Sequence, residues 1–438
     1  MVQFTRRKFL KSTSAATGVA ASPVLFAPDA HAQWAGKPEP GAKLRVLRWK
    51  RFVQGDEDQF MINVKKFEET YKVSVRIDSE GFEDIRPKAA VAANVGSGPD
   101  IIAGWFDDPH QYPDKLIPLT DVADYLGKKY GGWYDSAREY GMRGKEWIAI
   151  PWGCAGGTMV HRISHMQAAG FNEFPKDTAG FLKLCQGLKA KNTPAGFALG
   201  NATGDGNGWC HWLVWTFGGK MVDKDNKVVI DSPETLKALE YSRELYATFI
   251  PGTLSWLDPN NNKAFIDGQI SLTNNGISVY YAAKTSSDPK IKDMAADIGH
   301  ANMPIGPIGR PTELHLVTQW MAFKHSKFPK ASKEFIRFMM EKEQYEPWQQ
   351  AAIGYISQPL RAYESNPIWT VDPKHTPYRD CFKNLVSNGH AGRLGFASAG
   401  AMADFIIVNM VAEAASGSKS PKEAMERAQK RAERYYKV

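Results

Sequence analysis

The side chains best suited to hold a polar molecule stand close together in the stretch 96–112, which reads GSGPDIIAGWFDDPHQY. Trp105 could cover the C–H face of a sugar ring, and Asp107 and Asp108 could accept hydrogen bonds from hydroxyl groups. Turn residues, a short apolar run and then a polar loop predict a buried parallel strand that ends here. Ligands of open α/β sheets bind outside the carboxyl ends of such strands. The alternative is an ordinary strand, whose tryptophan packs in the core and whose carboxylates cap the next helix.

Catalytic chemistry finds little support in the sequence, which has no G-x-S-x-G elbow, no H-E-x-x-H motif and no Walker loop. Hydrolysis of a glycoside needs two carboxylates about 5–9 Å apart around one bond, whereas the adjacent Asp107 and Asp108 should diverge. His161 and His165 are four residues apart, but no third metal ligand is evident nearby. We therefore expect no enzyme activity, no metal and no cofactor, and keep a secreted glycoside hydrolase as an alternative.

Because of three cationic residues, the sequence does not decide whether the ligand is neutral or anionic. Lys50 and Arg51 follow the first expected strand, and Arg393 lies in a glycine-rich loop, HAGRLGF. If the fold brings these side chains together, they would suit an anionic ligand such as a sugar acid or a sulfonated sugar, because guanidinium groups bind planar anions through paired hydrogen bonds. Otherwise they are solvated surface cations.

The N-terminal segment 1–32 has the composition of an export signal. A twin-arginine motif, TRRKFLK at 5–11, precedes a mildly apolar stretch at 15–27 and a small-x-small cleavage site that ends at Ala32. The apolar stretch is too short to span a membrane stably. We expect cleavage near Ala32 and a periplasmic mature protein.

The rest of the chain is too long for one hydrophobic core, so two domains are expected. Strand-like runs at 44–49 and 73–77 alternate with helical patterns at 60–71 and 85–95 before the opening stretch is reached. This order predicts a parallel sheet with helical crossovers. The alternation of strands and helices starts again after the glycine-rich segment 153–157, which we interpret as a passage between domains.

Charge and cysteine content narrow the function further. The net charge is +8, and no block of lysines and arginines marks a nucleic-acid-binding surface. The cysteines form no metal or redox motif, and their state, free or bridged, stays open at this point. They are Cys154, Cys185, Cys210 and Cys381.

Several pieces of sequence, in order along the chain, resemble the periplasmic solute-binding proteins of ABC importers, the group that includes maltose-binding protein. The pieces are FEETYKVSVRI, GSGPDII, AIPWG before a strand of small residues, AGF..FPKDTAGFLKLCQGLK, AFIDGQISLTNNG, MPIGPIGRPTELHLVTQWMAFKHSKFPKASKEFIRFMM and IGYISQPLR. No single piece is specific, but their shared order behind an export signal is typical of that family. The pieces do not identify a ligand.

The resemblance implies two doubly wound α/β lobes joined by three hinge crossings, with a ligand cleft between the lobes. Lobe one would comprise residues 43–152 and 303–353. Lobe two would comprise residues 157–298 and 358–438.

The three crossings would lie near 151–156, 299–304 and 353–358. Such a joint can hinge with little loss of packing, because few side chains span it. A ligand held by both lobes would bind the closed state better and shift the population toward it.

The same resemblance implies a monomer that captures a ligand in the periplasm and delivers it to an ABC permease in the inner membrane. Thirteen tryptophans, several of them at strand ends and crossings, suit a sugar, a polyol or a short oligosaccharide. The residues expected to bind the ligand are Lys50, Arg51, Trp105, Asp107, Trp152, Asn207, Trp209, Asn274, Gln319, Tyr355 and Arg393.

Overall fold

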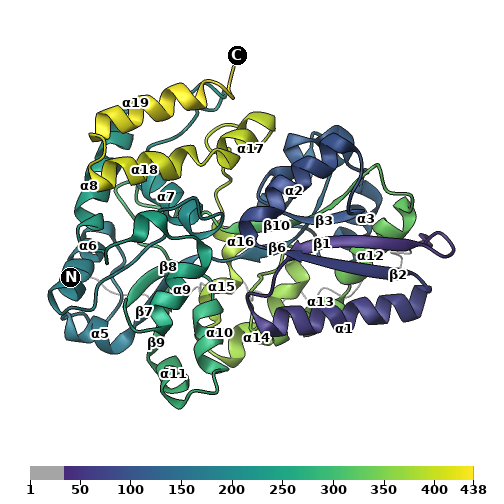
Figure 1. The fold of residues 1–438 in the computed structure, drawn as a ribbon, viewed down its shortest axis with the longest axis horizontal. Helices are drawn as coiled ribbons and strands as arrows, with labels where there is room; N and C mark the ends of the chain where they lie inside the picture. The colour runs from purple at the N-terminus through teal and green to yellow at the C-terminus, as the bar shows by residue number, and fades with distance from the viewer. Residues whose placement is uncertain (1–33, 438) are drawn as a thin grey trace, which may run out of the picture.

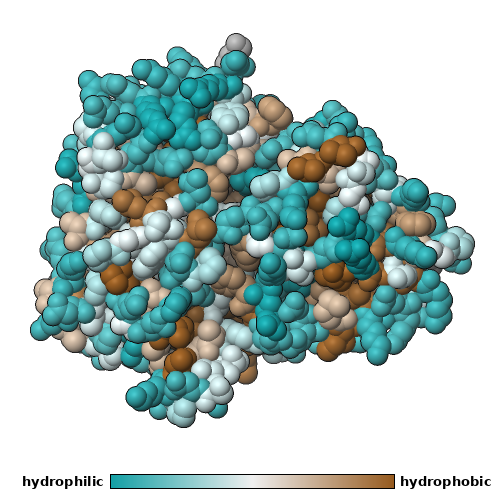
Figure 2. Space-filling view, in the orientation of Figure 1, coloured by the Kyte–Doolittle hydropathy of each residue, from teal (hydrophilic) through white to brown (hydrophobic). Residues whose placement is uncertain are grey.

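The computed structural model describes residues 34–437, so the expected export signal at 1–32 lies outside the described residues. The described chain forms two lobes that stand side by side (Figure 1). Lobe one contains the first strands of the chain, and lobe two contains most of its middle part and its last helices. On the face seen in Figure 2, hydrophilic residues cover most of both lobes and hydrophobic residues show as separate patches.

The sheet of lobe one has five strands in the order β2-β1-β3-β10-β6. β1, β2 and β3 run parallel, as the alternation of strands and helices predicts, and β10 runs antiparallel to both of its neighbours. β3 is buried along its whole length, which explains its continuous apolar sequence, IIAGW. The strands are β1 (Lys43–Trp49), β2 (Ser74–Glu80), β3 (Ile101–Trp105), β6 (Ile150–Ala155) and β10 (Leu316–Ala322).

Helices cover both sides of this sheet, with α1 and α13 on one side and α2 on the other (Figure 1). Under α1 and α13 lies a cluster of aromatic rings in which Trp152 stacks on Trp320, at 4.2 Å between centroids, and on Trp348, at 4.5 Å. The buried Arg48 forms an ion pair with Asp56 beside these rings. The main helices of lobe one are α1 (Gln54–Tyr71), α2 (Phe82–Val95), α3 (Thr120–Lys129), α4 (Asp135–Gly141), α12 (Pro329–Met339) and α13 (Lys342–Ala351).

The sheet of lobe two is smaller and has the order β8-β7-β9, in which both outer strands run antiparallel to β7. Helices surround it, and α8 begins with Pro233 in its first turn and with the Ser232 hydroxyl accepting the Thr235 N–H at 3.2 Å. The strands are β7 (Thr158–Arg162), β8 (Leu272–Asn275) and β9 (Ile298–Ala301); the helices include α5 (Ile163–Ala168), α6 (Thr178–Ala190), α7 (Asp205–Thr216), α8 (Pro233–Tyr246), α9 (Asp258–Ile266), α10 (Ser278–Lys284) and α11 (Pro289–Met294).

The last helices, α17 (Phe396–Ala403), α18 (Ile406–Ser416) and α19 (Pro421–Ala432), return to lobe two, where α18 and α19 pack on α8. By length and composition alone, 396–416 is apolar enough to cross a membrane. Half of this stretch is buried in the protein, and its two helices are separated at Phe405, which has a φ of 50°. The apolar residues of α18 are therefore accounted for as core residues of lobe two.

The first crossing runs directly from β6 into β7 through Gly156 and Gly157. A Cβ atom on Gly156 would lie 2.4 Å from the sulfur of Cys381, so the absence of a side chain permits this close approach. The second crossing runs from β9 to β10, and its His315 accepts the Gly157 N–H at 3.1 Å, which ties it to the first. The predicted ranges 151–156 and 299–304 overlap the ends of β6 and β9, from which these two crossings leave.

The third passage comes later than the predicted 353–358. Ser357 exchanges two backbone hydrogen bonds with Cys154 of β6, and the backbone N–H groups of Arg361 and Ala362 then donate to carbonyls at 132 and 130 in lobe one. The chain reaches lobe two only near Lys374, whose carbonyl lies 2.8 Å from His300 Nδ1. Backbone pairing with β6 and with the 130–132 segment keeps residues 356–362 on lobe one.

All four cysteines are buried and free. Cys154 and Cys381 lie where the crossings meet, and Cys185 and Cys210 lie in helices α6 and α7 of lobe two. The question that the sequence left open is thereby answered in favour of free thiols.

Replacing Trp152 by alanine tests whether the aromatic cluster is the core of lobe one. Because Trp152 is 1% exposed and stacks on two other indoles, the Trp152→Ala variant should lower the free energy of unfolding by about 3–5 kcal/mol. Denaturant unfolding measures this change, and Val371→Ala, at a 72% exposed position, should have little effect. Unchanged stability in Trp152→Ala would contradict the core assignment.

Candidate functional site

A cavity lies where the two lobes and the crossings meet. Its free volume is only about 30 Å³, roughly the volume of one water molecule, whereas sites for small molecules usually enclose about 300–1,000 Å³. The lobes are therefore closed on each other here, and a small molecule could enter and be held only with the lobes further apart than in this form. The lining residues are Phe52, Phe82, Ala155, Gly156, Gly157, Gly204, Asp205, Gly208, Asp258, Asn274, Asn275, Gly276, Ser278, Leu314, Leu316 and Tyr355.

Lobe one contributes an aromatic wall to this cavity. Phe52 follows β1, Phe82 begins the helix after β2, and Tyr355 follows α13. Phe52 lies 5.2 Å from Phe82 and 6.3 Å from Tyr355 between ring centroids, and the latter two rings are nearly parallel. Two of these rings therefore stand at the carboxyl ends of parallel strands, the edge at which open α/β sheets bind ligands.

Lobe two contributes a wall of oxygen atoms. Asp258, the first residue of α9, accepts the backbone N–H groups of Asp205 at 2.7 Å and Gly204 at 3.1 Å, which fixes the loop before α7. Asp205 in turn accepts an N–H of Asn261 at 2.8 Å. Burial raises the pKa of both carboxyls above the ordinary value of 3.8, and the nearby Asp258 adds to the rise for Asp205.

Asn274 adds an acceptor that no protein group uses. Its side-chain N–H donates to the carbonyl of Thr158 at 3.1 Å, and its buried Oδ1 has no hydrogen-bond partner within the described chain. A Cβ atom on Gly157 would lie 3.3 Å from this oxygen, so the oxygen faces the glycine-lined side of the cavity. A buried acceptor without a partner is unfavourable, and a ligand donor would satisfy it.

Of the residues expected to bind a ligand, Asn274 and Tyr355 line the cavity, and the other nine do not. Trp105, Trp152 and Trp209 are almost fully buried inside their lobes. Trp105 stacks on the inner side of Phe82, at 4.8 Å between centroids, and donates its indole N–H to the Phe82 carbonyl at 3.0 Å. Trp209 likewise donates to the carbonyl of Ala198 at 2.6 Å. In this closed state the tryptophans support the walls of the site and do not form them.

Three of the polar candidates outside the cavity, Asp107, Asn207 and Gln319, are also buried. Asp107 precedes the short helix η1 (Asp108–Gln111) and accepts the Ser398 hydroxyl at 2.6 Å, which joins lobe one to α17. Asn207 donates to the Thr203 carbonyl at 3.1 Å in the first turn of α7. Gln319 of β10 donates to the carbonyls of Phe106 and, at 3.2 Å, Tyr140. These side chains hold loops in place around the site.

The structure does not bring the three candidate cations together at the cavity. Lys50, Arg51 and Arg393 are exposed. Arg51 lies 3.7 Å from Glu57, and Arg393 is anchored through its backbone N–H, which donates to Asn226. In the described part of the chain, no lysine or arginine lines the cavity. The interpretation of a cationic cleft for an anionic ligand therefore has no support in this geometry.

Sequence reasoning missed Phe52, Phe82, Asp205 and Asp258. Phe52 and Phe82 could have been found from their places just beyond β1 and β2, the same rule that pointed to Trp105. Asp205 and Asp258 are 53 residues apart and belong to no motif, so only the fold reveals that they meet.

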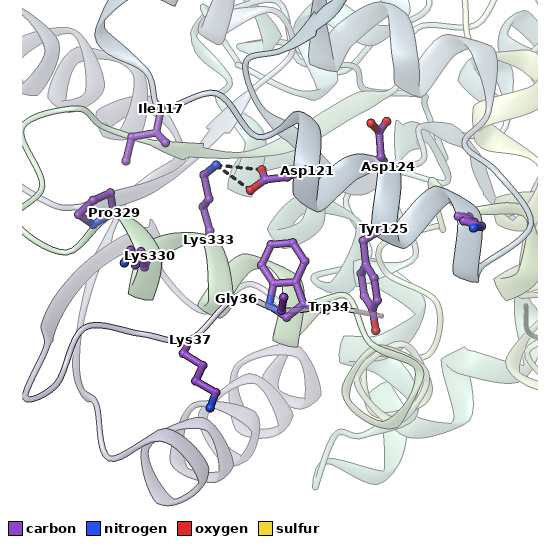
Figure 3. Close-up of a pocket in the computed structure, with 12 residues that line it drawn as sticks. Trp34, Gly36, Lys37, Ile117, Asp121, Asp124, Tyr125, Pro329, Lys330 and Lys333 are labelled. Atoms are coloured by element: carbon purple, nitrogen blue, oxygen red, sulfur yellow. Dashed lines mark hydrogen bonds and ion pairs between the residues drawn. The ribbon is translucent and has the colours of Figure 1, made fainter. Parts of the chain in front are cut away.

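A larger cavity, of about 980 Å³, lies on lobe one between α3, α12 and the segment 34–37 (Figure 3). Trp34 stands between the two helices, and Lys333 forms an ion pair with Asp121 at 2.9 Å. All of its lining residues belong to lobe one and the N-terminal segment. A molecule bound there would not touch both lobes, so the cavity between the lobes is the candidate site.

No group of three His, Cys, Asp or Glu residues that could hold a metal occurs within 34–437.

A profile of the family described as "Bacterial extracellular solute-binding protein" matches residues 63–377, more than two thirds of the chain. The chain belongs to this family. The solute-binding protein is also 25% identical over 205 residues to a protein of Deinococcus radiodurans named "Probable ABC transporter-binding protein". That match covers 45% of this chain and 48% of the relative, so it spans about half the length of the relative.

Solved structures share the fold of this solute-binding protein. It superposes on maltose-bound MalE3 of Thermotoga maritima with a TM-score of 0.77 at 18% identity, over 90% of this chain and 99% of that one. It superposes on a solute-binding protein of Thermotoga lettingae bound with α-D-tagatose with a TM-score of 0.75 at 18% identity, over 90% and 100% of the two chains. The expected two-lobed α/β architecture is thereby confirmed.

The buried carboxyls of this solute-binding protein predict a pH dependence of stability. A carboxyl with a raised pKa stays protonated in the folded state at a pH where the unfolded chain has released the proton. The contribution of the Asp258 carboxyl to the free energy of unfolding is therefore fully present at pH values below 3.8, its ordinary pKa. This contribution is lost as the pH rises through the raised pKa of the folded state.

Replacing Asp258 by asparagine should remove this loss while keeping one carbonyl oxygen for the loop. The free energy of unfolding of the parent should fall relative to that of Asp258→Asn as pH rises from about 4 to about 7. Denaturant unfolding across this range measures the difference, with Asp293→Asn, an exposed position, as the control. Parallel curves for parent and Asp258→Asn would contradict a buried carboxyl with a raised pKa.

Proposed function

We propose that this solute-binding protein is the substrate-binding component of a carbohydrate ABC importer. It captures a sugar, polyol or short oligosaccharide in the periplasm, performs no chemistry on it, and delivers it as a monomer to a permease of the inner membrane. The observation that carries the proposal is the cavity between the lobes, where an aromatic wall of Phe52, Phe82 and Tyr355 faces the oxygen atoms of the opposite wall.

The two walls match the two kinds of surface that a carbohydrate offers. Aromatic rings cover the apolar C–H faces of a sugar, and the carboxylates of Asp205 and Asp258 with the Oδ1 of Asn274 accept hydrogen bonds from its hydroxyls. Neither lobe alone surrounds a ligand, so binding and closure are coupled. The maltose and the tagatose bound by the two proteins of similar fold agree with this ligand class.

The N-terminal sequence supports export of the protein to the periplasm, where it would bind its ligand. The twin-arginine motif and the cleavage site that ends at Ala32 would release a mature protein into the periplasm. An ABC permease is the partner that family membership and the relative from Deinococcus radiodurans suggest. Protein recovered from the periplasm with its N-terminus near Gln33 would agree with this route, and recovery of the uncleaved chain from the cytoplasm alone would contradict it.

A thermal-shift screen tests the ligand class. Binding to the folded state alone raises the melting temperature in proportion to the logarithm of ligand concentration over Kd. Sugars, polyols and oligosaccharides at millimolar concentration should include at least one that raises Tm by several degrees, since micromolar affinity is ordinary for such a site. If none does so, the carbohydrate assignment fails. Recovery of the hit unchanged after long incubation would separate binding from hydrolysis.

Replacing Phe52 by alanine tests the aromatic wall with the carbohydrate found in that screen. Phe52 is only partly buried, so the fold should survive while affinity falls by roughly 1–3 kcal/mol, the scale of losing a buried ring face. Calorimetric titration measures the loss. The double variant Arg51→Gln, Arg393→Gln is the matched control and should bind like the parent, because both cations lie outside the cavity. Unchanged affinity in Phe52→Ala, together with weaker binding by the double variant, would favour an anionic ligand.

A further inference from the structure

Two carboxyl groups line the closed cavity, and a third, from the other lobe, lies near enough to one of them to affect its pKa. Asp205 and Asp258 line the cavity from lobe two, and Glu83, in the first turn of α2 next to the lining residue Phe82, belongs to lobe one and does not itself line the cavity. The charge of Glu83 contributes to the raised pKa of Asp258, so the two carboxylates interact across the joint. Among the residues that the structure describes, none of the three carboxylates takes part in an ion pair, and no lysine, arginine or histidine lines the cavity.

Two further oxygen atoms in this region lack partners. The Oε1 of Glu83 is buried and accepts no hydrogen bond from any described residue. The Oδ1 of Asn274, a residue 2% exposed, faces the cavity from the other lobe and is also unpartnered. Both atoms can only accept hydrogen bonds, so the group that completes this site must be a donor.

The aromatic wall also favours a ligand group that carries positive charge. The faces of Phe52, Phe82 and Tyr355 carry the negative part of the ring quadrupole, which attracts a cation within about 6 Å of the ring centre. Burial raises the pKa of Asp205 and Asp258, so their ionised forms are disfavoured in the closed site, and a ligand cation beside them would favour those forms. Hydroxyl groups can donate to the same acceptors, but they bring no positive charge.

We propose that the ligand carries a protonated amine, as an amino sugar does, and that its ammonium group lies among Glu83, Asp205 and Asp258 when the lobes close. This inference rests on the proposed function, because it specifies the carbohydrate that the cavity holds. An ammonium group has three N–H donors and a full positive charge, so it satisfies the unpartnered acceptors and offsets the carboxylates together. The ligand thus supplies the counter-ion when the lobes close around it.

Calorimetric titration of the full mature chain at pH 7 with matched sugars tests this proposal. The probes are D-glucosamine, D-glucose and N-acetyl-D-glucosamine, with the corresponding galactose and mannose series and 1,4-diaminobutane as an amine without a sugar ring. At least one amino sugar should bind about tenfold or more tightly than its neutral hydroxyl and N-acetyl counterparts, the scale of a hydrogen bond to a charged group. The preference should shrink as salt is raised from about 0.05 to 0.5 M.

Replacing Glu83 by glutamine identifies the source of the preference. Glu83→Gln keeps the size of the side chain and removes its charge, so it should weaken amino-sugar binding about tenfold and leave a neutral sugar unaffected. Asp84→Asn, at the next and exposed position of the same helix turn, is the matched control and should bind like the parent. Equal melting temperatures of the three proteins would show that the variants fold alike.

The possible results separate this inference from the proposed function. Neutral sugars that bind as tightly as amino sugars, or more tightly, would overturn the amine and leave the carbohydrate importer standing. Binding of 1,4-diaminobutane without binding of any sugar would uphold the ammonium site and overturn the amino sugar as its source. No binding of any probe would overturn the inference, and together with a negative thermal-shift screen it would overturn the proposed function. If Glu83→Gln kept the same preference for amino sugars over neutral sugars, Glu83 would not be part of the binding site.

Discussion

The direct passage of β6 into β7 is the constraint on which the rest of the structure depends. Gly156 and Gly157 let one strand leave the sheet of lobe one and enter that of lobe two without an intervening loop. The side chains of Cys381, His315 and Asn274 pack within hydrogen-bonding or van der Waals distance of this pair of glycines. Because neither glycine has a positive φ, their contribution in this closed state is close approach and not an unusual backbone angle. The cavity exists because the crossings meet at one place.

The aromatic residues act in two layers. Trp105 lies behind Phe82, and Trp49 lies 5.3 Å from Trp105, so the wall of the cavity rests on a buried aromatic cluster. The indole N–H groups of Trp105 and Trp49 both have protein acceptors, the Phe82 carbonyl for Trp105 and the Asp56 carboxylate for Trp49. A satisfied inner layer gives the outer rings a rigid backing, which keeps the ligand-facing surface fixed while the lobes move.

The sequence predicts the parts of this protein that repeat a regular pattern. The alternation of strands and helices at 44–95 and the passage at Gly156–Gly157 follow from periodicity and glycine content, and both agree with the structure. Placing Trp105 at the carboxyl end of β3 was also right, but the sequence does not distinguish a ring that faces the cavity from one that faces the core. The indole is fixed inward by its hydrogen bond to Phe82, a contact between residues 23 positions apart. The charge at the cavity also differs from that of the whole chain: the net charge is +8, whereas the charged residue types in the described lining of the cavity are two aspartates, Asp205 and Asp258.

The central claim is that a ligand is held between the lobes and that holding it closes them. Small-angle scattering of the mature protein, without and with a saturating amount of the bound carbohydrate, tests this claim most directly. A cavity of about 30 Å³ admits no sugar until the lobes part, so the free protein must populate an open form. The radius of gyration should be larger without ligand than with it, because the ligand draws the two lobes together around itself. Identical curves under saturation would contradict it.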